Sequence, residues 1–238
     1  MNRNLKLVLA TIYLICLLIL IFGVFYFVDL SDLRNFSFIK ENSNALISFK
    51  DKNLIVFSFI FFLFSALWVL FLGFGSPIAI ASGFIFGKWL GTIITVSSFT
   101  VGSSILYLLA NLYFKEFIKK YLSSRIARYK ILFSKNELLY FMIFRFAGGG
   151  GIPFAIQNVL PVIFNMKMKN YFYSTFIGLI PMIFVINALG SGIENIIDQS
   201  DSIKLTSIIY NKEIYLPLIS FLVVLILSYL VKLKFFKK

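Results

Sequence analysis

One arginine, Arg145, stands inside an apolar stretch and almost directly before a run of four glycines. The surrounding residues read Phe-Met-Ile-Phe-Arg-Phe-Ala, and Gly148, Gly149, Gly150 and Gly151 follow. A guanidinium at membrane depth is costly and usually marks a functional contact. Successive glycines can turn several backbone N–H groups toward one point and so form an anion-binding nest. This combination suits a phosphate group, because the planar guanidinium offers paired donors.

Three residues after the glycine run extend this candidate substrate-binding set. Pro153 breaks the segment, while Gln157 and Asn158 can each donate and accept hydrogen bonds. Structural roles stay open for two of these residues. Arg145 could cap carbonyl groups within the bend or extend to the bilayer interface. Asn158 could bond one bent segment to the other.

A short phrase occurs twice, each time within a highly apolar part of the chain. Residues 75–80 read GSPIAI, and residues 151–156, 76 positions later, read GIPFAI. Proline inside a helix removes a backbone donor and clashes with the preceding turn. Two equivalent broken segments in a membrane protein are typical of a transporter-like binding site.

The apolar runs that must position these residues predict an all-α polytopic membrane protein. The chain has 238 residues, is 60% hydrophobic, and has a mean hydropathy of +0.92. Uncharged runs of about 18 residues or more predict membrane spans. The expected full spans, about five, lie at residues 7–28, 54–72, 91–112, 171–190 and 214–231.

Two further segments are too broken to be straight spans, so we expect re-entrant hairpins there. The first lies at about 74–88, where Gly75, Pro77, Gly83 and Gly87 supply breaks, and the second covers 138–166. Irregular backbone cannot face lipid, so each hairpin must be buried in protein or face water. Only the span at 91–112 separates them, so they enter from opposite faces. This arrangement is an inverted repeat.

The organisation along the chain is expected to have three parts. These are an N-terminal span and surface segment (1–53), a core with both hairpins (54–193), and a loop with a C-terminal span (194–238). Basic residues number 17 on one side of this arrangement and five on the other, which places the C-terminus in the cytoplasm. Arg3 and Lys6, before the first span, argue against the external N-terminus that this count implies.

Composition also excludes several classes of function. The chain has no histidine and one cysteine, Cys16, so we expect no metal site, no cofactor and no enzyme activity. All ten carboxylates lie in predicted loops, so a membrane proton relay is not supported. The net charge is +13, and the basic residues flank apolar spans. This position favours a role in setting topology and in contacts with anionic lipid head groups over binding of nucleic acid.

At the residues around both breaks the chain resembles the DedA-like membrane proteins, also called the VTT-domain or SNARE-associated Golgi protein family. The likeness covers about residues 75–190. It departs from the family at Gly148, where a proline is frequent, and at Asn111, where a basic residue is frequent. The residues that carry it are Pro77, Gly83, Phe86, Gly87, Gly91, Thr92, Gly102, 107–110, Arg145, Pro153, Phe154, Asn158, Tyr171, Thr175, Gly178, Pro181 and Gly190.

The resemblance implies movement of phospholipids or polyprenyl phosphates across a bilayer by scrambling or flipping. The partners would be membrane lipids with phosphate head groups, and self-association stays open. A transporter for a small solute or ion, and a non-transporting protein of membrane homeostasis, are the alternatives. The abundance of Ile, Phe, Lys and Asn favours a bacterial plasma membrane as the location.

Overall fold

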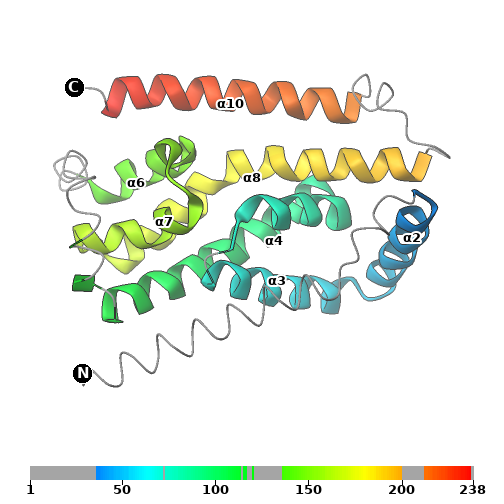
Figure 1. Ribbon diagram of the computed structural model, residues 1–238, viewed down its shortest axis with the longest axis horizontal. Helices are drawn as coiled ribbons and strands as arrows, with labels where there is room; N and C mark the ends of the chain where they lie inside the picture. Colours follow the sequence, from blue (N-terminus) through cyan, green and yellow to red (C-terminus); the bar gives the residue numbers. More distant parts are fainter. Residues whose placement is uncertain are drawn as a thin grey trace. The chain divides into compact units, whose positions relative to one another are not determined.

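All secondary structure that the computed structural model describes is helical (Figure 1). The described residues are 36–71, 73–113, 115–116, 120, 136–199 and 212–236. The predicted first span at 7–28 lies outside them, as do most of residues 113–135 and all of residues 200–211. The chain divides into two compact units, Met1–Ser48 and Phe49–Lys238. The predicted three-part division of the chain stays a prediction.

Helix α2 (Phe36–Lys52) begins in the first unit and carries Lys50 and Lys52 in its last turn. Everything that positions the candidate site belongs to the second unit. That unit contains α3 (Leu54–Leu70), α4 (Gly75–Tyr113), α6 (Glu137–Phe146), α8 (Met168–Gln199) and α10 (Lys212–Phe236). Between α6 and α8 the chain forms η2 (Gly148–Gly151), α7 (Phe154–Val159) and η3 (Leu160–Phe164).

Helix α3 and the first part of α4, residues 75–86, form an antiparallel pair that we call the first hairpin. The rings of Phe57 and Phe61, near the start of α3, lie 5.7 and 5.2 Å from the ring of Phe86. At the other end the indole Nε1 of Trp68 donates to the carbonyl of Phe74 at 2.9 Å. The chain therefore reverses direction between α3 and α4, where the first copy of the repeated phrase begins.

Gly87 divides α4 into two legs, residues 75–86 and 88–113. Its φ of 74° and ψ of 174° are not helical, and glycine adopts a positive φ without steric cost. The legs fold against each other, since the Ser82 hydroxyl donates to the Gly91 carbonyl at 3.1 Å. A Cβ on Gly75 would lie 2.9 Å from Phe99, so the start of the first leg lies against the middle of the second.

The expectation of a complete hairpin within 74–88 is therefore wrong. Residues 75–86 form one unbroken leg, whose partner on the entering side is α3. Gly83 is not a break, because it lies inside this leg against the backbone of Asn187 in α8. Pro77 is tolerated in the first turn, where backbone N–H groups have no intrahelical partner.

The second half of the core begins with a broken segment that also folds back, which we call the second hairpin (α6, η2, α7 and η3). The predicted break occurs at the glycine run, where Gly148 and Gly149 have φ values of 61° and 69°. Pro153 then caps α7. The Glu137 carboxylate, at the start of α6, accepts from the backbone N–H of Lys167 at 3.2 Å. The two ends of this segment therefore lie side by side.

Both halves present the same order of elements. Each has a helix, a break at one copy of the phrase, a short helical stretch, a left-handed residue and a long helix. The left-handed residues are Gly87 and Asn165, whose φ is 50°. Their separation of 78 positions nearly equals that of the two phrases. The relation of the two halves to a bilayer, and hence the inverted repeat and the five spans, stays a prediction.

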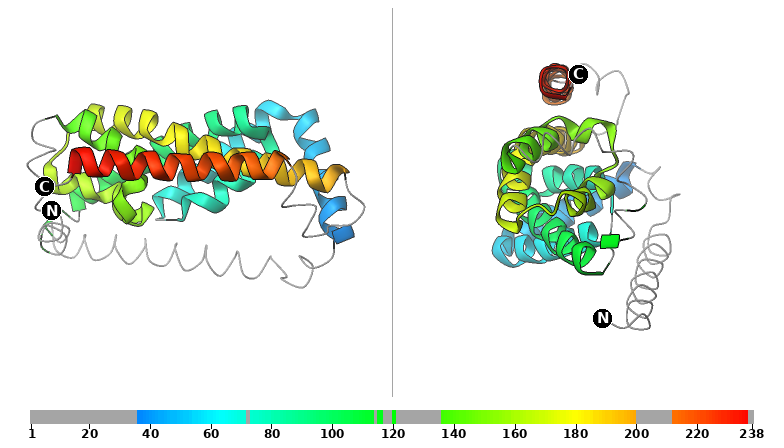
Figure 2. Two further views of the ribbon diagram at one scale, coloured as in Figure 1. Left: turned by 90° about the horizontal axis from the view of Figure 1, so that it is seen from above. Right: turned by 90° about the vertical axis from the view of Figure 1, so that its left-hand side faces the viewer.

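Helix α8 packs against α4, α6 and α10, which run beside it in Figures 1 and 2. Glycines permit these close approaches. A Cβ on Gly190 would overlap the carbonyl of Ile80, and one on Gly102 would overlap the carbonyl of Ala66. Gly102 therefore lets α3 and α4 pack closely.

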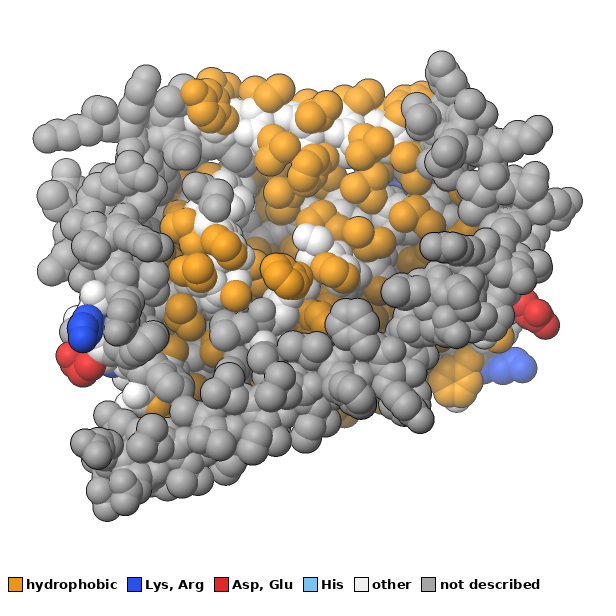
Figure 3. Space-filling model, viewed as in Figure 1, with side chains coloured by type: hydrophobic (Ala, Val, Ile, Leu, Met, Phe, Trp, Pro, Cys, Tyr) orange, Lys and Arg blue, Asp and Glu red, His pale blue; other side chains and the backbone are white. Residues whose placement is uncertain are grey.

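Two described helices are long and apolar enough to cross a membrane, α4 and residues 168–197 of α8, or three if the bent pair 41–52 and 54–70 counts as one. Helix α10 contains a shorter apolar stretch, Ile214–Leu227. Large apolar side chains such as Ile55, Phe59, Leu222 and Ile226 are exposed on α3 and α10. Hydrophobic side chains likewise cover the middle of the face in Figure 3. A soluble surface rarely exposes so large an apolar area.

Candidate functional site

Arg145 lies in the last turn of α6 and is 1% exposed. It shares the buried face of this helix with Phe141 and Phe144, at the spacing that helical periodicity predicts. Helix α8 comes close because Gly178 faces this point. A Cβ on Gly178 would lie 2.7 Å from the Cβ of Arg145 and from the carbonyl of Met142.

The Arg145 guanidinium donates three hydrogen bonds to neutral side chains. Nη2 donates to Asn158 Oδ1 at 2.7 Å and to Tyr171 Oη at 3.1 Å, and Nη1 donates to Gln157 Oε1 at 3.3 Å. Arg145 therefore neither extends to an interface nor takes its described acceptors from the backbone. It holds the predicted residues Gln157 and Asn158 to the end of α6.

Aromatic rings complete the surroundings of the cation. The Arg145 Cζ lies 4.9 Å from the ring centroid of Phe141, 5.4 Å from Phe154 and 5.9 Å from Tyr171. Such rings attract a cation through their quadrupole. In the part of the chain that the structure describes, no carboxylate pairs with Arg145. Glu137 instead accepts from Asn170 Nδ2 at 2.5 Å, at the other end of α6.

Gln157 packs against the glycine run. Its Nε2 donates to the carbonyl of Ile152 at 2.7 Å and to that of Gly148 at 3.3 Å. A Cβ on Gly149 would overlap the end of this side chain. The run and the residue after it thus each present one carbonyl to Gln157, and the predicted N–H nest for an anion stays a prediction.

Two buried donors at this point have no acceptor among the described residues. They are Nε of Arg145 and Nδ2 of Asn158, and Asn158 is fully buried. A buried donor without an acceptor costs about 1–3 kcal/mol. Three of the five guanidinium N–H groups are used by the contacts above. The arrangement can therefore accept further negative or polar oxygen.

The two broken segments meet beside this cluster. The ring of Phe154, at the start of α7, lies 5.6 Å from the ring of Phe99 in α4. A Cβ on Gly75 would lie 3.7 Å from the same Phe154 ring. The starts of the two short helical stretches, which carry the repeated phrase, are thus neighbours. Pro77 and Pro153 themselves are exposed, so they shape the breaks without joining the buried cluster.

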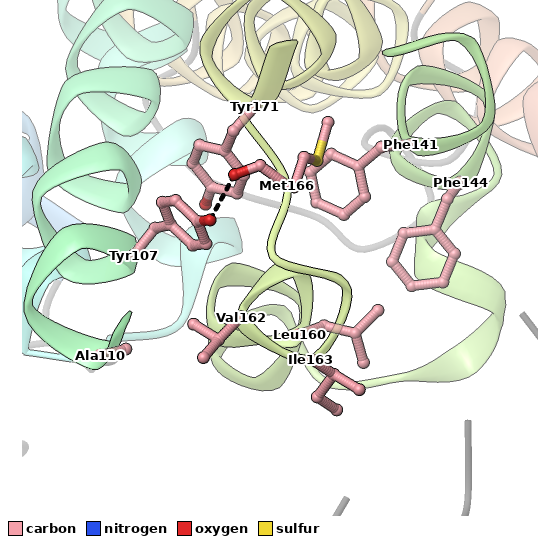
Figure 4. Packing of buried hydrophobic residues seen from close by; sticks show 9 residues of the cluster. All are labelled: Tyr107, Ala110, Phe141, Phe144, Leu160, Val162, Ile163, Met166 and Tyr171. Atoms are coloured by element: carbon pink, nitrogen blue, oxygen red, sulfur yellow. Dashed lines mark hydrogen bonds between the residues drawn. The ribbon is translucent and has the colours of Figure 1, made fainter. Parts of the chain in front are cut away.

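Tyr171 and Tyr107 belong to the site, and sequence reasoning gave neither of them a site role. Their rings stack at 4.7 Å with an angle of 16°, and the Tyr107 hydroxyl donates to the carbonyl of Met166 at 2.5 Å (Figure 4). The Tyr171 hydroxyl lies 3.2 Å from the carbonyls of Ser103 and Asn158. Their hydroxyl groups are the sequence signal that could have identified them, because a hydroxyl inside an apolar helix needs a hydrogen-bond partner.

A family model described as the VTT domain matches residues 68–192. The chain belongs to the VTT-domain family. This VTT-domain chain is 24% identical over 182 residues to "Transmembrane protein 41 homolog" of Caenorhabditis elegans, covering 74% of the chain and 72% of that relative. No solved structure shows a significant match.

The matched region contains both copies of the phrase, Gly87, Arg145 and Asn165. With its long apolar helices, the VTT-domain chain is an integral membrane protein. No group of three or more His, Cys, Asp or Glu side chains suited to a metal occurs within the described ranges.

Proposed function

We propose that this VTT-domain protein moves lipids with phosphate head groups between the two leaflets of a membrane. The observation that carries the proposal is Arg145, a buried cation whose partners among the described residues are neutral side chains, where two broken helical segments meet. The family resemblance supplies the lipid class, phospholipid or polyprenyl phosphate. The head group would pass along Arg145, Gln157 and Asn158, while the tails stay in lipid.

The lengths of the helices support a position of this cluster at membrane depth. The ten residues of α6 rise about 15 Å, half of the roughly 30 Å hydrocarbon core. If Glu137 lies at the interface, Arg145 lies near the bilayer midplane. The leg 88–113 of α4 has 26 residues and rises about 39 Å, enough for a full crossing. Both hairpins then enter the membrane from opposite faces and meet at the centre.

We also propose a topology that differs from the expected one. Because α3 and residues 75–86 are antiparallel, residues 53 and 87 lie on one face, and four crossings replace five: 7–28, 88–113, α8 and α10. Both termini then lie in the cytoplasm, with 15 basic residues on that side and seven outside. This arrangement removes the conflict at Arg3 and Lys6. The location we propose is the plasma membrane of a bacterium.

A phosphate would improve on the neutral acceptors that Arg145 now has. Hydrogen bonds to an anionic oxygen are shorter and roughly twice as strong as those between neutral groups. An anion would also compensate a buried positive charge, which is expensive when it has no counter-ion. The unpaired donors Arg145 Nε and Asn158 Nδ2 could then bond its oxygens. No catalytic group, metal or cofactor is needed for this role.

The proposal is tested by reconstitution into liposomes with fluorescent phospholipid and, separately, fluorescent polyprenyl phosphate. Bleaching of the outer leaflet reports transbilayer movement. We expect Arg145→Met to slow movement by at least about tenfold, because loss of a bond to a charged group costs more than 1.4 kcal/mol. The matched control is Lys88→Met, which removes an exposed positive charge beside Gly87.

The outcomes of this assay, of a solute-uptake assay and of a cellular test separate the three candidate functions. Movement that depends on Arg145 and not on Lys88 supports the proposal. No acceleration of either lipid by the wild-type protein overturns it. Uptake of a soluble ion or solute that depends on Arg145, without lipid movement, would favour the transporter alternative. A cellular phenotype that survives Arg145→Met would favour a non-transporting role in membrane homeostasis.

A further inference from the structure

We propose that Tyr171 is a positioning residue that fixes the Arg145 guanidinium and links it to α4. The inference rests on the function proposed above and deepens it, because it names the contact through which the first half of the core acts on the head-group site. Tyr171 lies in the first turn of α8 and is completely buried.

The hydroxyl of Tyr171 stands between the two halves of the core. It accepts from Arg145 Nη2 at 3.1 Å, and its own proton can reach the carbonyl of Ser103 or of Asn158, each at 3.2 Å. Ser103 belongs to the leg 88–113 of α4, while Arg145 and Asn158 belong to the second hairpin. This hydroxyl is thus bonded to Arg145 and lies within hydrogen-bonding distance of the first half.

The ring of Tyr171 is fixed as firmly as its hydroxyl. It stacks on Tyr107 of α4 at 4.7 Å and on Phe141 of α6 at 5.4 Å. Figure 4 shows the Tyr107 and Tyr171 rings beside each other, with Met166 bonded to Tyr107. A ring held on both faces has little rotamer freedom, so its hydroxyl defines one position for Nη2. Tyr171 belongs to α8, so α4 acts on this acceptor through the stacked Tyr107 ring and the Ser103 carbonyl.

The test compares Tyr171→Phe, which keeps the ring, with Tyr173→Phe, an exposed tyrosine on the same helix. The first readout is the rate at which phenylglyoxal modifies Arg145 in the purified full-length protein, followed by peptide mass spectrometry. We expect Tyr171→Phe to raise this rate about tenfold, because a hydrogen bond to a charged group contributes at least 1.4 kcal/mol. Tyr173→Phe is expected to match the wild type.

Tyr107→Phe separates positioning from general loss of stability. It also removes a buried hydroxyl bond, to Met166, but does not touch Arg145. We expect the Arg145 modification rate of this variant to stay at the wild-type value. If Tyr171→Phe does not fold, Tyr171→His retains a ring with an acceptor nitrogen, and Arg145 should stay protected in it. Equal modification rates in Tyr171→Phe and Tyr173→Phe, or an unprotected Arg145 in Tyr171→His, would overturn the inference.

The second readout is lipid movement as a function of the mole fraction of phospholipid in the vesicle. For Tyr171→Phe we expect a half-saturating fraction raised about tenfold and a maximal rate near wild type, because binding geometry is lost and the path remains. A wild-type protein that moves no lipid would refute the proposed function, and the modification assay would still decide the role of Tyr171. Normal saturation in a lipid-moving Tyr171→Phe protein would refute only the role of Tyr171.

Discussion

Two neighbouring glycines offer a sharp test of how the glycine run supports Arg145. Gly148 and Gly149 both have positive φ, so an alanine at either position costs about 1–2 kcal/mol in backbone strain. A Cβ on Gly148 meets no atom within 4 Å, whereas one on Gly149 overlaps the side chain of Gln157. Gly149→Ala must therefore also displace Gln157, and Gly148→Ala serves as its matched control.

The displaced Gln157 loses three hydrogen bonds: those to the carbonyls of Ile152 and Gly148, and the one from Arg145. Only the first is short, at 2.7 Å, so we assign the set about 1–3 kcal/mol in total. For a domain of this size each kcal/mol corresponds to about 2–4 °C in Tm. We expect Gly149→Ala to melt about 2–12 °C below Gly148→Ala.

The assay is thermal unfolding of the purified protein in one detergent, followed through the fluorescence of its two tryptophans. The scan rate is kept constant, because membrane proteins unfold irreversibly. Lipid movement should also fall more in Gly149→Ala, since Arg145 loses the acceptor on Nη1. Equal Tm values for the two variants, or a lower Tm for Gly148→Ala, would refute the claim that the glycine run leaves space for the Gln157 side chain.

The remaining predictions concern the contacts that hold the two halves together. Gly83→Ala drives a Cβ into the backbone of α8 and should destabilise the protein by about 1–3 kcal/mol; an unchanged Tm would contradict this packing. Tyr107→Phe keeps the stacked ring but loses the hydrogen bond to Met166, so we expect it to lower the stability by about 1 kcal/mol in the same melt. An unchanged Tm would contradict a stabilising role of that bond. Glu137→Ala removes the acceptor for two donors near the start of α8 and should cost more stability than Glu137→Gln. The reverse order would contradict a stabilising role of these two hydrogen bonds.

The sequence predicted those features of the site that depend on residue type in an apolar context. The cost of burying a guanidinium singled out Arg145, and the structure buries it with two of the predicted neighbours, Gln157 and Asn158. The repeated phrase likewise predicted where the helices break. These inferences depend on local chemistry, which the sequence contains directly.

The features that the sequence could not predict depend on packing between distant segments. Gly83 and Gly87 look alike in the sequence, yet Gly83 allows close contact with α8, whereas Gly87 reverses the chain. The sign of φ at a glycine is set by the whole fold. The fit of the glycine run to the Gln157 side chain likewise appears only once α7 folds back, and the predicted anion nest stays a prediction.

The central claim is that two broken hairpins enter the bilayer from opposite faces and meet at Arg145. The most direct test is the sidedness of two exposed positions next to the left-handed turns, Lys88 and Lys167. In a Cys16→Ser background, Lys88→Cys and Lys167→Cys would be labelled in intact cells and in inverted vesicles with a membrane-impermeant maleimide. We predict labelling of position 88 only from outside and of position 167 only from the cytoplasmic side. Labelling of both positions from the same face would contradict the account.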